Sequence, residues 1–546
     1  MKSTVLRFGW LATMFLAALC ARAASPDGAP DASRFGRVHF STSTTPAAQA
    51  QFNRAVAMLH SFWYEELDGE FRKVLELDPT CAMAYWGLAM SKWHPLWEPP
   101  DGNTLSAGFE AVHEGKRLGA KTPREQAYLD AIGFFYTDYQ TLDHATRALR
   151  YARAMEKLHQ VYPADNEATA FYALALLATA SATDRTFTNQ LRAAALLQQV
   201  AAEETNHPGV VHYLIHAYDT PSLAARGLPE ALCYSQVAPA VPHALHMPSH
   251  IYTRLGLWDE SIQANLASEA VAGNYAAQVK MAGTWDEQLH ARDYLVYAYL
   301  QTARDQKAGE VVGQLQKNSH AAQQNFKAGY ALAAIPARYL LERRRWAEAA
   351  ALELVPKDFP WVNQAWPLAL HRFARCLGAA RAGNAGQARQ ELDSLFMLRP
   401  GGPQVTASYG LRQIEILYAE ASAWTAHAGH QDEAALRWMR QATDLEDAIE
   451  KKPVTPGPLI PARELLGELL LESGQPGPAL TEFEKSLKES PGRFNGLYGA
   501  ARAAMATGEP VRAQDYFQQL ISNCQHGDSQ RPELLASKRA VEGRLK

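Results

Sequence analysis

The chain has 546 residues, of which 47% are hydrophobic and 20% are charged, and its formal net charge is −4. This length is too great for one compact core, so the chain must form several domains or an extended array. The small negative charge argues against nucleic-acid binding, which depends on a surplus of Lys and Arg.

The first 23 residues have the order of a secretory signal peptide. The basic residues Lys2 and Arg7 lie within the first seven residues, the apolar run FGWLATMFLAALC follows, and the small residues ARA end the segment. The apolar run is shorter than the roughly 20 residues that span a bilayer. The segment 1–23 therefore predicts cleavage after Ala23, export to the periplasm or the extracellular space, and no integral membrane segment after cleavage.

Residues 24–45 are rich in Ser, Thr, Pro and Gly, which predicts a flexible linker. Beyond the signal peptide the sequence contains four widely spaced cysteines, namely Cys81, Cys233, Cys376 and Cys524. They form no C-x-x-C motif, so they do not indicate a zinc site, and the sequence leaves their disulfide pairing open.

From residue 46 onward the pattern is helical and repetitive. Glycine, alanine and phenylalanine at positions 474, 479 and 483 recur 34 residues later, as Gly508, Ala513 and Phe517. A period of 34 residues with small residues at helix crossings is typical of tetratricopeptide repeats. We therefore expect an all-α, superhelical array of helical hairpins (an α-solenoid), with one section over 46–400 and C-terminal repeats over 401–546.

Histidines are concentrated between residues 207 and 250, which hold six of the eighteen in the chain. In the stretch HPGVVHYLIHAYD, Pro208 and Gly209 predict the start of a helix. Residues four apart on a helix differ by about 40° around its axis, so His212 and His216 share a face with Asp219. Two imidazoles in this spacing can bind one metal ion.

The repeat register predicts that further histidines join this pair. His216, His246 and Asp293 each lie 15 residues before a small residue of the following helix. Equivalent positions of stacked repeats are neighbours, which predicts two parallel rows of side chains. The predicted metal ligands are His212, His216, His243, His246, His250, His290, Asp293 and Asp219. Imidazole and carboxylate suit zinc, copper or iron.

Two other interpretations stay open. Asp219 could orient a histidine instead of binding the ion, and the histidines could be ordinary hydrogen-bonding groups of a groove. Pro248 falls inside the expected helix, which would place His243 and His246 in a loop, and Pro336 occupies the equivalent place in a later repeat.

The stretches HPGVVHYLIHAYD, PHALHMPSHIYTRLGLW, CAMAYWGLAMSKWHPLW, DYLVYAYLQ and VTPGPLIPARELLG resemble a large family of exported bacterial tetratricopeptide-repeat proteins. The resemblance covers nearly all of the chain after the signal peptide. It implies the repeat fold, export, and first-helix positions that face a concave groove. No activity is established for that family.

Motifs of common enzymes are missing from the sequence: there is no G-x-S-x-G, no H-E-x-x-H, no P-loop and no Gly-rich dinucleotide loop. This favours a scaffold that binds a peptide or protein in its groove over an enzyme. The alternative is a metal-dependent hydrolase or oxidase, because an ion with an open coordination position can activate water or oxygen.

Overall fold

The computed structural model describes residues 34–96, 99–317, 320–399, 409–450 and 455–543. The predicted signal peptide, 1–23, lies outside these residues. Helices make up the regular structure of the described chain, which contains no strand and a single isolated bridge between Thr284 and Ala321. Within the same residues, no helix has both the length and the apolar character needed to span a membrane.

The chain divides into two compact units. The first comprises residues 1–219 and 223–251, and the second comprises 220–222 and 252–546. The structure thus divides between residues 219 and 252, whereas the sequence suggested a change of section at residue 400.

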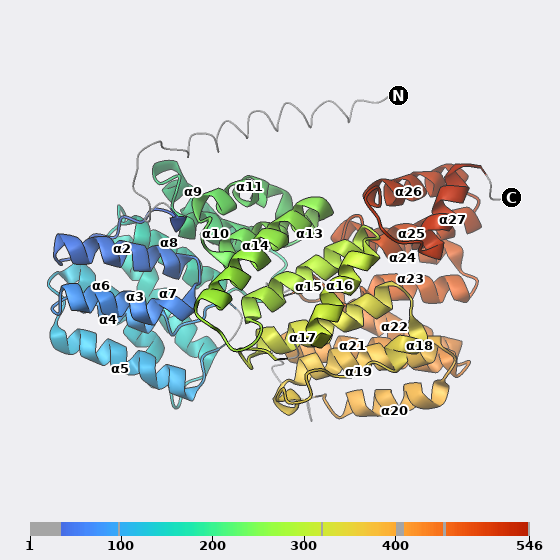
Figure 1. Cartoon of the computed structure of the whole chain (residues 1–546), viewed down its shortest axis with the longest axis horizontal. Coiled ribbons are helices and arrows are strands. Elements are labelled where there is room, and N and C mark those ends of the chain that lie inside the picture. The colour runs from blue at the N-terminus through green and yellow to red at the C-terminus, as the bar shows by residue number, and fades with distance from the viewer. Residues whose placement is uncertain (1–33, 97–98, 318–319, 400–408, 451–454, 544–546) are drawn as a thin grey trace, which may run out of the picture. The chain divides into compact units, whose positions relative to one another are not determined.

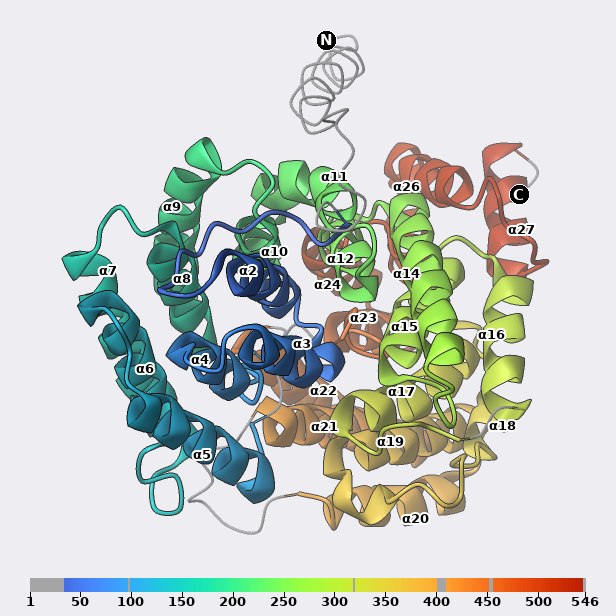
Figure 2. The same ribbon diagram turned by 60° about the vertical axis from the view of Figure 1, so that its left-hand side comes forward.

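The first unit is built from helical hairpins (Figure 1). Its elements are α2 (Pro46–His60), α3 (Tyr64–Leu77), α4 (Ala82–Met90), α5 (Gly102–Leu118), α6 (Pro123–Tyr136), α7 (His144–Val161), α8 (Asn166–Ala178), α9 (Thr188–Glu203), α10 (Pro208–Tyr218), η3 (Ala224–Gly227), α11 (Leu228–Val237), α12 (Pro242–His246) and the start of α13 (Pro248–Leu255). Successive helices pack in pairs, α2 on α3, α4 on α5, α6 on α7 and α8 on α9. Figure 2 shows α2 beside α8 and α10, and α2 and α10 are in contact.

The end of the expected linker belongs to this unit. Phe35, Val38 and Phe40 are buried, and the ring of Phe40 lies 5.4 Å from that of Phe52 and 5.2 Å from that of Trp86. Burying these side chains releases water from apolar surface, which holds the segment against the helices. The prediction of a flexible linker is therefore wrong for residues 34–45.

The second unit continues the pattern of paired helices. Its elements are the end of α13, α14 (Trp258–Gln278), α15 (Asp286–Gln301), α16 (Asp305–Lys317), α17 (Phe326–Glu342), α18 (Trp346–Ala350), η4 (Trp361–Asn363), α19 (Ala365–Arg381), α20 (Ala385–Phe396), α21 (Tyr409–Ala428), α22 (Asp432–Asp447), α23 (Ala462–Glu472), α24 (Pro476–Glu489), α25 (Phe494–Ala506), α26 (Pro510–Asn523) and α27 (Pro532–Val541). Here too the chain packs as hairpins, with α19 on α20, α21 on α22, α23 on α24 and α25 on α26.

Among the repeat residues, the alanines occupy the crossings between helices, as the sequence predicts, whereas Gly474 and Gly508 lie in the turns between helices with φ of 70° and 80°. Ala479 and Ala513 are fully buried. A Cβ atom on Gly467 would lie 2.7 Å from the ring of Phe483, which is closer than van der Waals contact allows. The small residue thus lets the aromatic ring fill the gap between the helices. The fold is an all-α, tetratricopeptide-like solenoid.

Two prolines behave differently from the expectation. Pro248 begins α13, and the residues before it form the short helix α12, so His243 and His246 lie on a helix and not in a loop. Pro336 lies inside α17, which begins at Phe326. The two prolines thus differ, because Pro248 is accommodated in the first turn of α13, whereas α17 continues through Pro336.

Candidate metal centre

Three residues at the start of α10 fix its position in the first unit. The ring Nδ1 of His207 accepts a hydrogen bond from the backbone N–H of Val210 at 3.2 Å, which caps the helix, and Pro208 occupies its first turn. A Cβ atom on Gly209 would lie 2.3 Å from Nδ1 of His60. Only glycine therefore allows α10 to approach the end of α2 this closely.

The next turns of α10 bring two imidazoles together with a third from α12. Nε2 of His212 lies 3.0 Å from Nε2 of His216 and 3.2 Å from Nε2 of His243. All three side chains are buried. The three rings can each offer one nitrogen, and these nitrogens lie within 4.8 Å of one another.

The backbone of α2 determines which nitrogen of His212 carries its proton. Nδ1 of His212 lies 2.7 Å from the carbonyl oxygen of His60, and a carbonyl can only accept a hydrogen bond. Nδ1 is therefore the donor, and Nε2 of the neutral ring has one lone pair. Two further ring nitrogens point at that lone pair. Either His216 or His243 can donate a hydrogen bond to the lone pair of His212. The convergence of all three Nε2 atoms is instead the arrangement of ligands around a cation.

The electrostatics also favour a neutral, ligating ring. Burial, followed by the neighbouring His216 and His243, lowers the pKa of His212 well below its ordinary value. A neutral imidazole is the form that binds transition metals. Zinc–nitrogen bonds of about 2.0–2.1 Å in a tetrahedral site place the nitrogens roughly 3.3 Å apart. The distances of 3.0 and 3.2 Å come within a few tenths of an ångström of that separation.

An aromatic side chain covers this group. Phe62 has a left-handed backbone with φ of 56°, and the centroid of its ring lies 4.4 Å from that of His212. It also contacts the rings of His216 and His243, at 6.1 and 5.8 Å between centroids. The opposite neighbour of His212 is Tyr234, whose ring is stacked on it at 5.3 Å.

The unusual backbone of Phe62 comes from the way α2 ends. The N–H groups of Phe62 and Trp63 donate to the carbonyls of Leu59 and Met58, at 3.1 and 3.2 Å. This is the helix-ending pattern in which the left-handed position is usually glycine. A bulky residue in this conformation costs about 1–2 kcal/mol, and at this position the side chain lies against the ring of His212.

A second pair of imidazoles lies beside the first. Nε2 of His246 is 3.0 Å from Nε2 of His250, and Nδ1 of His250 is 2.8 Å from the carboxylate oxygen Oδ2 of Asp219. All three side chains are buried. Asp219 thus stands in the arrangement of a carboxylate that orients a metal-binding histidine, one of the two roles considered from the sequence.

The remaining two predicted ligands belong to α15 of the second unit. His290 is buried there, and the centroid of its ring lies 5.4 Å from that of Tyr294. Oδ1 of Asp293 lies 3.4 Å from Nε of Arg338, and both side chains are buried. The structure therefore places Asp293 in an ion pair, and it brings five of the six predicted histidines and Asp219 together within the first unit.

Sequence reasoning missed another buried group, which contains His60, Glu167 and His207. Glu167 accepts hydrogen bonds from Nε2 of His60 at 2.8 Å and from Nε2 of His207 at 3.1 Å. Nδ1 of His60 lies 2.8 Å from the hydroxyl of Tyr213. Burial raises the pKa of Glu167, but the two histidines lower it further, so the carboxyl stays ionised. No local sequence motif indicates this group, because its members come from α2, α8 and the start of α10.

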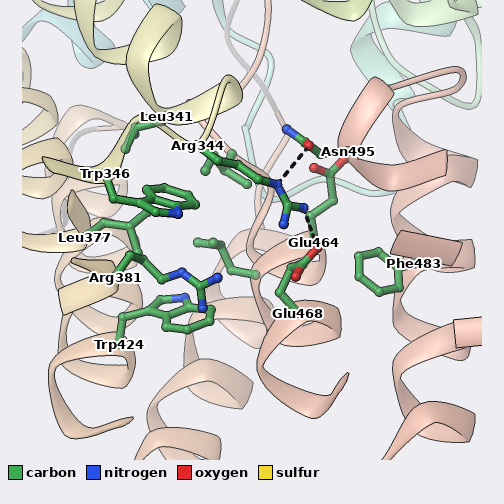
Figure 3. Close-up of a pocket in the computed structure, with 12 residues that line it drawn as sticks. Leu341, Arg344, Trp346, Leu377, Arg381, Trp424, Glu464, Glu468, Phe483 and Asn495 are labelled. Atoms are coloured by element: carbon green, nitrogen blue, oxygen red, sulfur yellow. Dashed lines mark hydrogen bonds and ion pairs between the residues drawn. The ribbon is translucent and has the colours of Figure 1, made fainter. Parts of the chain in front are cut away.

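The second unit contains a small pocket of about 30 Å³, shown in Figure 3. The guanidinium of Arg381 lies 4.3 Å from the ring centroid of Trp424 and 5.3 Å from that of Trp346. Nη2 of Arg344 lies 2.6 Å from a carboxylate oxygen of Glu468. Its walls thus combine aromatic rings and two arginines with the carboxylates of Glu464 and Glu468.

No protein-family model matches the sequence, and no curated protein matches it. Among solved structures, the chain is similar to the human IFIT1 dimer with PPP-AAAA, with a TM-score of 0.38 and 10% identity, over 85% of this chain and 94% of that one. It is also similar to the APC/C hetero-tetramer Cut9-Hcn1, with a TM-score of 0.33 and 11% identity, over 91% and 90%.

Proposed function

We propose that the chain is an exported helical-repeat protein that binds a transition-metal ion through His212, His216 and His243. One observation carries the proposal. Nε2 of His212, whose other nitrogen is committed to the carbonyl of His60, faces two further Nε2 atoms at 3.0 and 3.2 Å. A cation among the three nitrogens satisfies all of them at once, whereas protons satisfy one contact only.

The donor set restricts the metal to a group of ions. Three imidazole nitrogens suit zinc, copper or iron and disfavour magnesium and calcium, which prefer oxygen. A cysteine thiolate is not part of the group, and the described free cysteines Cys81, Cys376 and Cys524 are buried elsewhere. Export is supported by the order of residues in 1–23.

The fold supports a scaffold role, in which a peptide or protein partner binds along the repeats. Arrays of helical hairpins present extended surfaces to such partners. The net charge of −4 gives no support for a nucleic-acid partner.

A metal-dependent hydrolase or oxidase is the second candidate, and the number of ligands favours it. Three protein ligands leave a fourth position on a tetrahedral ion, which is the arrangement of catalytic sites and not of closed structural sites. Azide added to the cobalt-loaded protein distinguishes the two: an open position changes the visible absorption of the cobalt, whereas a closed site leaves it unchanged.

Metal analysis of the full chain, purified without chelators, tests the proposal. We expect at least one equivalent of zinc, copper or iron in the wild type and a loss of one equivalent in His216→Ala. His159→Ala is the matched control, because His159 belongs to the same unit and contacts Thr169 outside the group. A wild type that contains no metal and takes up none from added zinc, copper or iron would overturn the proposal.

A further inference from the structure

The two histidine pairs of the first unit are built in the same way. His212 and His216 are four residues apart, as are His246 and His250, and the Nε2 atoms are 3.0 Å apart in both pairs. In each pair one ring is held through Nδ1 by a buried oxygen, the carbonyl of His60 at 2.7 Å or the carboxylate of Asp219 at 2.8 Å. Equal geometry implies equal chemistry, so a reason to place an ion at the first pair applies to the second.

The anchoring oxygen distinguishes the pairs, and the difference favours a cation at the second. The carbonyl of His60 is neutral, and the first pair gains His243 as a third ligand. Asp219 is a buried carboxylate, whose negative charge makes the ring of His250 a stronger donor and offsets the charge of a bound ion. The second site thus has a buried carboxylate behind one of its rings where the first has a neutral carbonyl.

The two sites are neighbours. The ring centroid of His250 is 6.0 Å from that of His216, and the ring centroid of His246 is 6.1 Å from that of His243. Within each pair, however, the nitrogens point at each other at 3.0 Å. This arrangement describes two adjacent positions, not one shared position.

The geometry points to a dinuclear centre, in which a second transition-metal ion is held by His246 and His250 beside the ion at His212, His216 and His243. The inference rests on the proposed function for its first ion. His246 and His250 supply two ligands from the first unit, and water, a further side chain or an anionic ligand from outside, such as a carboxylate, can take the other positions of the second ion. Adjacent ions that share such a ligand are the arrangement of two-metal sites.

Equilibrium loading of the full chain with zinc tests the inference, with bound metal counted after gel filtration. We expect two equivalents in the wild type and in the control His159→Ala. We expect one equivalent in the double variant His246→Asn and His250→Asn, and one in His212→Asn and His243→Asn. Asp219→Asn keeps the shape of the site, and we expect it to weaken the second ion about 10–100-fold and leave the first unchanged.

Each contrary result has one meaning. A single equivalent that is lost only from the His212 and His243 variant overturns the second site and leaves the proposed function intact. A single equivalent that both double variants lose shows one ion shared by both pairs, which also overturns the dinuclear centre. If the wild type binds no zinc, copper or iron, both proposals fail. Circular dichroism of each variant establishes that it is folded, and Asp219→Asn supplies the test if a double variant is not.

Discussion

The first unit contains two buried histidine groups that differ in how their nitrogens are satisfied. In the group around Glu167, the carboxylate accepts from both rings, the remaining nitrogen of His60 contacts the hydroxyl of Tyr213, and that of His207 accepts from a backbone N–H. In the group around His212, three ring nitrogens converge, with Nε2 of His212 3.0 Å from that of His216 and 3.2 Å from that of His243. Proximity alone therefore does not indicate a metal site, whereas an account of each donor and acceptor separates a hydrogen-bonded network from a set of ligands.

The largest effect expected from this comparison is on metal affinity. His212→Ala removes one of three ligands, which should weaken binding of the first ion by about 4 kcal/mol, or roughly 10³-fold. Competition with a chromophoric chelator measures this change. Glu167→Gln is the control, because it alters the other group and should leave the affinity within about twofold. An equal loss in both variants would mean that the two groups are not functionally distinct.

The free energy of unfolding should be lowered more by Glu167→Gln than by His212→Ala, the reverse of the order expected for metal affinity. Glu167→Gln removes the buried carboxylate that accepts hydrogen bonds from two histidines. We therefore expect the free energy of unfolding of the first unit to fall by about 3 kcal/mol. Because the folded pKa of Glu167 lies below its unfolded value, its contribution is present above about pH 4.5 and is lost as the pH falls below it. Urea titrations at pH 7 and pH 4 measure both effects. A variant as stable as the wild type at pH 7 would contradict the assignment of Glu167 as a structural group.

Removal of metal should destabilise the first unit by a slightly smaller amount. A ligand at about 100 times its Kd stabilises the folded state by about 2.7 kcal/mol, so a chelator should lower the Tm accordingly. Differential scanning calorimetry with and without the chelator measures the shift. The shift should persist in full in Glu167→Gln and should shrink in His212→Ala to the part that the second ion contributes, and an undiminished shift in both variants would place the first ion elsewhere.

The smallest expected effect concerns Phe62, which lies over the ligand group with φ of 56°. Phe62→Ala and Phe62→Gly both remove the ring, but glycine accepts the left-handed backbone without strain. We therefore expect the glycine variant to be about 1 kcal/mol more stable than the alanine variant, as measured by chemical unfolding. Equal stabilities would show that the backbone at this position is not strained.

Much of the fold could be predicted from the sequence, because repeat periodicity reports helix packing directly. The 34-residue register identified Ala479 and Ala513 as crossing residues, and the structure buries them there. The prediction of a linker was wrong at Phe35, Val38 and Phe40. It relied on the Ser, Thr, Pro and Gly content of the whole segment and gave too little weight to these three apolar residues. Pro248 was expected to leave its neighbours in a loop, yet the short helix α12 ends just before it.

The candidate site was predictable where it depends on helical spacing. The four-residue interval joins His212 to His216, and the repeat register adds His243. The carbonyl of His60 was not predictable, because a backbone group leaves no mark in a side-chain pattern and lies 152 positions away from His212. The position of the Phe62 side chain was not predictable for another reason. Phe62 follows the end of α2, at a position where glycine is the usual residue, so the sequence did not indicate a left-handed backbone there.

The proposed ligands of the first ion come from α10 and α12, with α11 between them in the sequence. The ring of His212 is oriented by its hydrogen bond to the carbonyl of His60, the last residue of α2. An extended polypeptide therefore has no such pocket and gathers it only as the hairpins close. A chain that crosses a membrane unfolded would travel without its ion and would acquire one at its destination. The identity of the bound element would then reflect the supply in that compartment and not the supply where the chain was synthesised.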